Sequence, residues 1–219
     1  KLDTSSDMAF LSLGKDCAEN SITGVMNLRR AKQLIKGTAH SINDCLHEGQ
    51  KLMVQVLSEP ASFENKSLML TAKPRLDGRY VSVELGSSRL NFSKDLGPKT
   101  IKPLKEPLSA LTEKVAILVR ARATAVAHDT VIAEAKWLVG AITANVEFSL
   151  TAMEKALISA PDSDQHIYID DIGAIADIKT IVHQRWPDLA DRIQPYKGQT
   201  SAFEEYGVEE AIEEALSDQ

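Results

Sequence analysis

The stretch Trp186–Leu216 reads WPDLADRIQPYKGQTSAFEEYGVEEAIEEAL and says more about the fold than any other part of the chain. Pro187 ends or restarts a helix, because its ring fixes φ and removes a backbone donor. Ile193–Tyr196 is long enough only for a short strand, and Lys197-Gly198 is typical of a turn. The stretch therefore predicts a helix end, a short strand, a turn and a second helix.

The second helix of this stretch is strongly acidic. Apolar side chains recur along it at nearly helical spacing, at Phe203, Tyr206, Val208, Ile212 and Leu216. Glutamates occupy its other faces, at Glu204, Glu205, Glu209, Glu210, Glu213 and Glu214. Such a row of like charges is typical of a solvated face. We therefore expect an amphipathic helix from Ser201 onward, with its glutamates in water.

The residues just before this stretch continue the pattern. His166–Asp170 predicts a strand, and Gly173–Arg185 predicts an amphipathic helix with its isoleucines inward. The order strand, helix, strand, helix is typical of a small α/β unit. Asp170 and Asp171 are adjacent, so on a strand their side chains point to opposite faces and cannot chelate one metal ion together. We interpret the pair as surface charge and as the signal that begins the helix.

The composition is ordinary for a soluble globular protein. Of the 219 residues, 43% are apolar and 26% are charged. No apolar run approaches the roughly 18–20 residues that span a bilayer. The chain begins KLDTSSDMAF, without a Met or a signal-peptide pattern, so we expect a piece of a longer chain. Cys17 and Cys45 form neither a disulfide framework nor a zinc motif, which favours a cytoplasmic protein.

Charge is distributed unevenly along the chain. Residues 1–105 contain 16 Lys and Arg against 11 Asp and Glu, whereas residues 106–219 contain 9 against 20. The overall charge of −6 argues against broad affinity for nucleic acids, but the basic first half is able to meet phosphates. We expect the acidic second half to face solvent or a protein partner.

Short strands dominate the first part of the chain. Apolar runs bounded by turn residues predict strands at Ala9–Leu13, Ile22–Leu28, Leu52–Leu57 and Leu68–Ala72. Several short strands within so few residues favour a small barrel or sheet. Farther along, Ala116–Val119 predicts a strand that ends in Arg120, and Thr130–Gly140 predicts a helix.

Four runs of this chain resemble the ribonuclease E/G family. Residues 187–216 are similar, in order, to the segment that leads into the family's catalytic domain, and AFLSLG, HEGQKLMVQVLSEP and ENKSLMLTAKPRLDGRYVSV resemble its earlier strands. The resemblance implies an α+β fold in three parts. These are an incomplete OB-fold (S1-like) β-barrel over residues 1–70, a 5′-sensor-like α+β region over 71–163, and a small α/β ribonuclease-H-like subdomain over 164–219.

The resemblance also implies RNA contacts in the first part. Phe10 matches an aromatic residue that stacks on a base, and Lys66 matches a basic residue near the nucleic-acid path. From the residues alone, Phe10 is also explained as a core strand residue, and Lys66 as a solvated loop lysine. Both alternatives stay open at this point.

A sensor for a 5′-monophosphate on the RNA is implied in the same way. Such a site needs arginine for bidentate contact and unhindered backbone N–H groups. Gly78 matches the glycine whose backbone approaches the phosphate, Arg120 matches the phosphate-binding arginine, and Lys94 occupies a neighbouring basic position. The family's threonine after this arginine is Ala121 here, which removes a hydroxyl donor. Arg120 is alternatively an edge-strand arginine in a surface ion pair.

Finally, the resemblance implies endoribonuclease activity in RNA processing and decay, by Mg²⁺-assisted hydrolysis of phosphodiesters. The family's catalytic aspartates and zinc-binding cysteines are expected beyond Gln219, so no catalytic or metal-ligating residue is identified within this chain. We expect the chain alone to bind single-stranded RNA without cutting it. A stand-alone RNA-binding or protein-interaction module is the alternative. A homo-oligomer remains open, and no membrane partner is expected.

Overall fold

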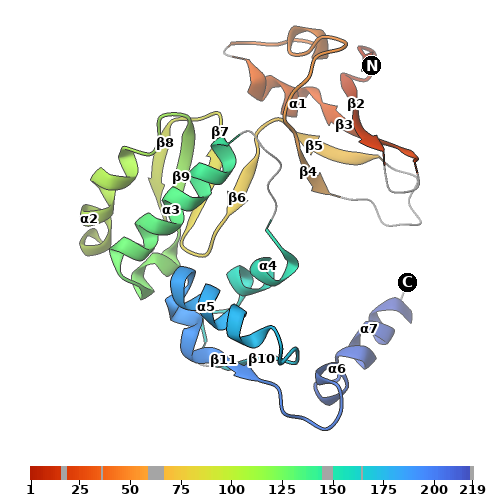
Figure 1. Ribbon diagram of the computed structural model, residues 1–219. Helices are drawn as coiled ribbons and strands as arrows, with labels where there is room; N and C mark the ends of the chain where they lie inside the picture. Colours follow the sequence, from red (N-terminus) through yellow and green to blue (C-terminus); the bar gives the residue numbers. More distant parts are fainter. Residues whose placement is uncertain (16–18, 36, 59–66, 145–149, 164, 218–219) are drawn as a thin grey trace.

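The chain has a mixed α+β fold with three separate β-sheets, as a computed structural model shows (Figure 1). The structure describes residues 1–15, 19–35, 37–58, 67–144, 150–163 and 165–217. Two hydrophobic cores hold these elements together, one beneath the first sheet and one shared by the second sheet and the C-terminal α/β unit. Within the described residues, no helix has both the length and the apolar character needed to cross a bilayer.

The first sheet has five strands in the spatial order β1-β2-β3-β5-β4. They are β1 (Leu2–Asp3), β2 (Met8–Lys15), β3 (Ser21–Asn27), β4 (Gln55–Ser58) and β5 (Leu68–Thr71). Neighbouring strands are antiparallel except β3 and β5, which run parallel. All four short strands predicted for this part are found, although β4 begins at Gln55 and not at Leu52.

The first sheet is open, whereas the sequence predicted an incomplete OB-fold barrel. Its edge strands, β1 and β4, are short and do not pair with each other, so the described residues form no closed barrel. Between β3 and β4 the chain forms α1 (Leu28–Ala31) and the short 3-10 helices η1 (Lys32–Leu34) and η2 (Ile42–Asp44). Met26, Ile42 and Leu70 are fully buried in the core between these elements and the sheet.

The second sheet has four strands in the order β6-β7-β9-β8. They are β6 (Arg75–Asp77), β7 (Val81–Leu85), β8 (Arg89–Phe92) and β9 (Val115–Val119). β8 and β9 are parallel, and α2 (Pro98–Ser109) connects them. α3 (His128–Thr143), which contains the predicted helix, packs on β7 and against α2. Leucines of both helices enter the same core as the valines of β7 and β9, so both helices cover one face of this sheet.

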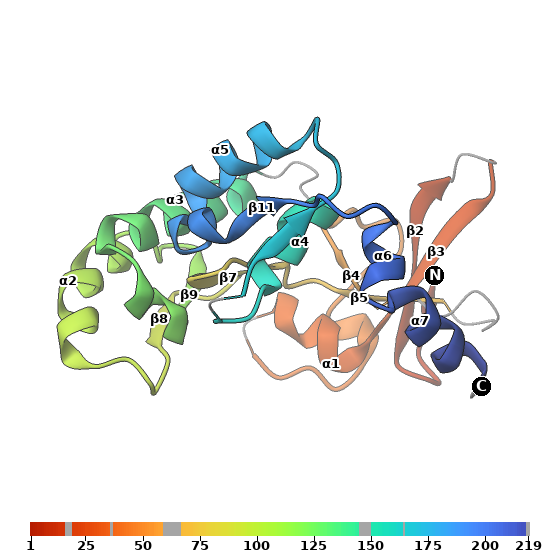
Figure 2. The ribbon, with the colours of Figure 1, turned by 90° about the horizontal axis from the view of Figure 1, so that it is seen from below.

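The C-terminal α/β unit follows the predicted order. β10 (Ile167–Ile169) leads to α5 (Ile175–Arg185), the 3-10 helix η4 (Pro187–Arg192) and β11 (Ile193–Pro195), and β10 and β11 pair in parallel. Asp171 accepts a hydrogen bond from the backbone N–H of Ala174 over 3.1 Å, just before α5, as expected for a helix-start signal. In Figure 2 this unit lies beside α3 and α4 (Ala152–Ser159).

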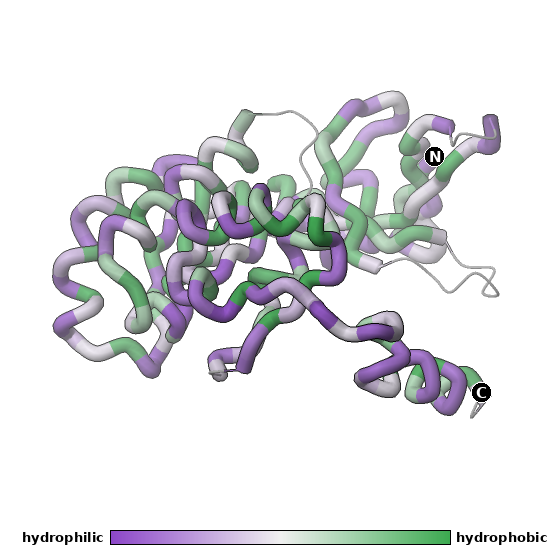
Figure 3. The backbone as a smooth tube through the Cα atoms, turned by 60° about the horizontal axis from the view of Figure 1, so that its bottom comes forward, coloured by the Kyte–Doolittle hydropathy of each residue, from purple (hydrophilic) through white to green (hydrophobic). Residues whose placement is uncertain are grey.

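The acidic tail differs from the expected single helix. It forms α6 (Ala202–Glu205) and α7 (Val208–Ser217), which are separated at Gly207, where φ is +63° in the left-handed region. The glutamates are exposed as predicted, but Phe203, Ile212 and Leu216 are at least 49% exposed too. Figure 3 shows the tail at the end of an extended segment, with apolar and polar residues alternating along it.

Candidate functional site

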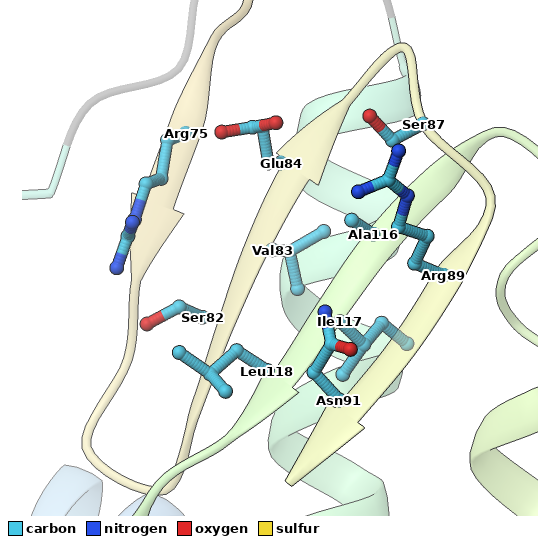
Figure 4. A pocket seen from close by; sticks show the side chains of 10 residues that line it. All are labelled: Arg75, Ser82, Val83, Glu84, Ser87, Arg89, Asn91, Ala116, Ile117 and Leu118. Atoms are coloured by element: carbon cyan, nitrogen blue, oxygen red, sulfur yellow. The ribbon is translucent and has the colours of Figure 1, made fainter. Parts of the chain in front are cut away.

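The second sheet has one covered face and one open face. Because side chains alternate along a strand, the valines of β7 point toward α3, and Ser82 and Glu84 point the other way. Strand pairing extends these two residues into rows on the open face: Arg75, Glu84, Ala116 and Arg89 in one, Asp77, Ser82, Leu118 and Asn91 in the other. Figure 4 shows this face, with the helices behind it and an arginine on each edge strand.

A cavity of about 610 Å³ lies between this open face and α4, and we call it the α4 cavity. Its walls come from β4, β6, β7, the end of β9 and α4: Gln55, Arg75, Leu76, Asp77, Ser82, Leu118, Arg120, Leu150, Lys155, Ile158 and Ser159. α4 begins with a capping box, in which Thr151 Oγ1 accepts from Glu154 N–H over 3.1 Å and the Glu154 carboxylate accepts from Thr151 N–H over 2.9 Å.

Three cations and one carboxylate line the α4 cavity. Arg75 Nε donates to Asp77 Oδ1 over 2.8 Å, which forms a local ion pair. Arg120 Nη1 donates to the carbonyl of Gly78 over 2.6 Å, which fixes the guanidinium without neutralising it. Lys155 is exposed and makes no ion pair within the part of the chain that the structure describes. The cavity therefore carries net positive charge and suits an anionic ligand.

Ser82 lies in the wall of this cavity. It is 4% exposed, and its Oγ has no hydrogen-bond partner among the described residues. The pKa of Asp77 is lowered, because the opposing effect of burial is outweighed by the nearby Ser82 hydroxyl and by Arg75. The hydroxyl thus lies close to this carboxylate without reaching good bonding geometry. A buried hydroxyl of this kind is available to a polar atom of a ligand.

The turn between β6 and β7, which positions Arg120, is held by the buried Glu134 of α3. Glu134 Oε1 accepts from Arg79 N–H and Trp186 Nε1–H, both over 2.9 Å. Its Oε2 accepts from the N–H groups of Tyr80 and Val81, over 2.7 and 2.9 Å. Burial raises the pKa of Glu134, and the four donors act in the opposite direction. One carboxylate therefore connects the turn, α3 and the residue that precedes η4.

Close packing requires glycine at position 78. A Cβ there would lie 2.8 Å from both Glu134 Cδ and Leu138 Cδ1, closer than real Cβ contacts. The N–H of Gly78 donates to the carbonyl of Val81 over 2.8 Å, within the turn itself. The structure thus explains this glycine by its approach to α3 and by its contact with Arg120.

Arg79, in the same turn, is 1% exposed and joins three segments. Its Nε donates to Asp188 of η4 over 2.6 Å, and its Nη1 donates to the carbonyl of Ala160, just after α4, over 2.9 Å. The hydroxyl of Tyr80 also donates to Asp188. Because α4 contributes Lys155 to the cavity wall, this network determines the position of α4 and of Lys155 relative to the second sheet.

The sequence-predicted site residues fall into three groups. Gly78 and Arg120 are in direct contact at the end of the second sheet where β9 ends. Lys94 is exposed just after β8 and does not line the α4 cavity. Its neighbour Ser93 is tied to the end of β9, because the N–H of Ser93 donates to Val119 O over 2.8 Å. Phe10 is 37% exposed on β2 and is not buried in the core. Lys66 lies outside the described residues.

Sequence reasoning did not identify Arg75, Ser82 or Lys155 as parts of the site. Arg75 and Ser82 lie on the open face only because β6 and β7 pair in this register. The capping-box pattern of Thr151 and Glu154 predicts the start of the helix that carries Lys155. The pattern does not predict that this helix lies beside β9.

The described residues contain no group of three or more His, Cys, Asp or Glu side chains arranged to hold a metal ion. No catalytic step is assigned to the part of the chain that the structure describes.

A basic cavity beside an open polar sheet is chemically suited to an anionic group such as a phosphate. The chain belongs to the Ribonuclease E/G family, whose model matches residues 75–219. The matched residues include every element of the second sheet and the C-terminal unit.

Two curated relatives are similar to this chain. Ribonuclease E from Synechocystis sp. is 29% identical over 128 residues, which cover 58% of this chain and 18% of that protein. Ribonuclease G from Haemophilus influenzae is 25% identical over 193 residues, which cover 80% of this chain and 38% of that protein. The chain thus spans less than half the length of either relative.

Proposed function

We propose that this chain is the RNA-binding portion of a ribonuclease E/G-type endoribonuclease that acts in RNA processing and decay. The main support for this proposal is that the family match, over residues 75–219, includes nearly all of the residues that line the basic α4 cavity. In this proposal the first sheet is the OB-type part and residues 164–219 are the ribonuclease-H-like part. The ligand is single-stranded RNA.

The α4 cavity is the proposed site for a 5′-monophosphate. Arg120 is its main anion ligand, because its guanidinium retains donors beyond the one that contacts Gly78 O. Lys155 adds a second cation from the opposite wall of the cavity. Lys94 lies outside the cavity and adds positive charge at the same end of the sheet as Arg120. Gly78 acts by positioning Arg120, because its own N–H is engaged by Val81 O.

The first sheet contributes the proposed contacts with the rest of the RNA. Phe10 presents part of its ring to solvent, and an exposed aromatic ring on a sheet is able to stack on a base. Lys66 remains a prediction, in which its ammonium group contacts a phosphate.

Removal of Arg120 tests the phosphate site. We expect wild-type chain to bind a 5′-monophosphorylated RNA more tightly than the same RNA with a 5′-hydroxyl, in a salt-sensitive manner. Arg120→Ala should weaken binding of the phosphorylated RNA about tenfold, since a charge-assisted arginine–phosphate contact is worth roughly 1.5–3 kcal/mol. Fluorescence anisotropy at several salt concentrations measures both effects.

Two controls accompany this measurement. Lys66→Ala should weaken both RNAs to a similar degree and lower the slope of log affinity against log salt by roughly 0.7. Lys102→Ala removes an exposed lysine from α2, on the covered side of the sheet, and should change little. Equal affinity of Arg120→Ala and wild-type chain for phosphorylated RNA would refute the proposed site, and salt-insensitive binding would argue against RNA binding by charge.

We further expect that the chain alone leaves RNA intact. The described residues bring no metal-binding group of carboxylates together, and metal-assisted hydrolysis needs a fixed ion. Labelled single-stranded RNA incubated with the chain, with and without Mg²⁺, should show no new bands on a denaturing gel. Mg²⁺-dependent cleavage that Asp170→Asn abolishes would contradict this expectation.

A further inference from the structure

Two further hollows lie in series with the α4 cavity, and each shares lining residues with its neighbour. The first lies on the open face and shares Arg75, Ser82 and Leu118 with the α4 cavity (Figure 4). The second lies between η1 and the turn that joins β7 to β8, and shares Ser87 and Arg89 with the first. The three depressions therefore follow one another, from α4 across the second sheet to the first unit.

Basic side chains line this series of three depressions, which we call the basic track. Its cations are Lys155, Arg120, Arg75, Arg89, Lys73 and Lys32, in order from the α4 cavity. Only two carboxylates, Asp77 and Glu84, line the same three depressions. This excess of positive charge is notable in a chain whose net charge is −6.

The two carboxylates neutralise only part of the basic track. Asp77 pairs with Arg75 over 2.8 Å, and Glu84 lies 3.8 Å from Lys73 Nζ, which also donates to Ser87. Arg89 and Lys32 make no ion pair within the described residues, and both are exposed. A ligand that crosses the sheet would therefore meet uncompensated cations beyond the α4 cavity.

The dimensions of the track favour a polymer. Arg75 and Arg89 lie in the same row but on the two edge strands, β6 and β8. Three strand spacings of roughly 4.8 Å separate these strands, or about 14 Å. One terminal phosphate cannot bridge that distance, whereas a polyanion with regularly spaced charges can contact both edges.

The floor of the open face suits nucleotides more than an acidic peptide. Leu118 is 36% exposed in the neighbouring row, between Ser82 and Asn91, where its side chain offers an apolar surface to a ribose or a base. Asn91, beside it, carries both donors and acceptors for a base edge, and the Ser82 hydroxyl lacks a partner among the described residues. Single-strand binding surfaces combine a positively charged groove with side chains against which bases pack, most often aromatic ones.

We propose that single-stranded RNA with its 5′ end in the α4 cavity continues along the basic track, across the open face of the second sheet toward η1. Arg89 is the central phosphate contact of this path. The inference rests on the proposed function and extends it from the terminal phosphate to the nucleotides that follow.

The length dependence of binding tests the track. We expect wild-type chain to bind a 5′-monophosphorylated octanucleotide more tightly than the corresponding dinucleotide. Arg89→Ala should weaken the octanucleotide about three- to fivefold, leave the dinucleotide unchanged, and lower the salt slope by roughly 0.7, the value for one phosphate of a single strand. Lys102→Ala, with the same charge change on the covered side, is the matched control.

The outcomes separate this inference from the proposed function. Equal effects of Arg89→Ala and Lys102→Ala on the octanucleotide would overturn the track, even where Arg120→Ala still abolishes the preference for a 5′-phosphate. Conversely, if Arg120→Ala has no effect, the phosphate site fails, and the track is then tested with a 5′-hydroxyl octanucleotide. Displacement of the RNA by polyglutamate at equal charge concentration would indicate an acidic protein segment as the ligand and would also overturn the track.

Discussion

Glu134→Ala is expected to lower the free energy of unfolding by roughly 4 kcal/mol. The carboxylate accepts four hydrogen bonds at a position that is 4% exposed, and its removal leaves three backbone N–H groups and one indole N–H without an acceptor. A buried donor without a partner costs about 1–3 kcal/mol, although partial entry of water reduces the sum. Alanine is a better helix former than glutamate, so helix propensity cannot explain a loss.

Urea unfolding followed by tryptophan fluorescence measures this effect. Trp186 is a direct probe, because its ring is fully buried and its Nε1–H donates to Glu134. Lys136→Ala, at an exposed position on the same helix, is the control and should change stability by less than about 0.5 kcal/mol. A Glu134→Ala variant within about 1 kcal/mol of wild type would show that the carboxylate does not hold the turn.

Replacement of Arg79 by alanine is expected to destabilise the chain by about 3–5 kcal/mol, as is typical when one member of a buried ion pair is removed. Asp188, whose side chain is 13% exposed, would keep the hydroxyl of Tyr80 as its one remaining side-chain donor among the described residues. The carbonyl of Ala160 would also lose its guanidinium contact. Arg79→Lys should restore little, since an ammonium group lacks the planar fork that reaches both segments.

A double-mutant cycle distinguishes the two acidic partners of Arg79. Asp188 is nearly buried and lies 2.6 Å from Nε, whereas the side chain of Asp162 is 63% exposed and lies 3.3 Å from Nη2. We expect strong coupling between Arg79 and Asp188, and a coupling below about 1 kcal/mol between Arg79 and Asp162. Equal coupling to both carboxylates would contradict the assignment of Asp188 as the structural partner.

The Arg79 variant should also affect the ligand site. The guanidinium holds the end of α4, and α4 carries Lys155 into the wall of the cavity. A folded Arg79→Ala chain is therefore expected to bind 5′-monophosphorylated RNA less tightly than wild type. This loss would arise although Arg79 is buried and does not itself line the cavity.

Local patterns in the sequence were sufficient for several elements. The short apolar run Ala9–Leu13 and the helical spacing of Gly173–Arg185 predicted β2 and α5, because both patterns are set within a few residues of the chain. The segment around Pro187 predicted η4 and β11 in their order. The turn predicted at Lys197-Gly198 was wrong, because these residues are irregular and extended. Resemblance to the family supplied Gly78 and Arg120, which the structure brings into contact.

Other elements went against local preference. α2 was not predicted, because Pro103 and Pro107 lie inside it and proline disfavours helix interiors. Leu104 and Leu108 of this helix are fully buried in the second core, and their burial offsets the lost backbone hydrogen bonds. The first sheet does not close into a barrel, since closure depends on whether the two edge strands meet, which no short pattern encodes.

By itself, the sequence determined the order of short strands and helices, the charge difference between the two halves, and the family. The tertiary structure alone decided which residues form the site. Arg75, Ser82, Lys155 and Arg89 share one surface only because strand register and helix packing place them there. Glu134 and Trp186 are 52 residues apart and bond only after the fold forms. Periodicity reports the surroundings of a residue within a few positions along the chain, whereas a buried carboxylate acquires its donors from segments that only folding brings together.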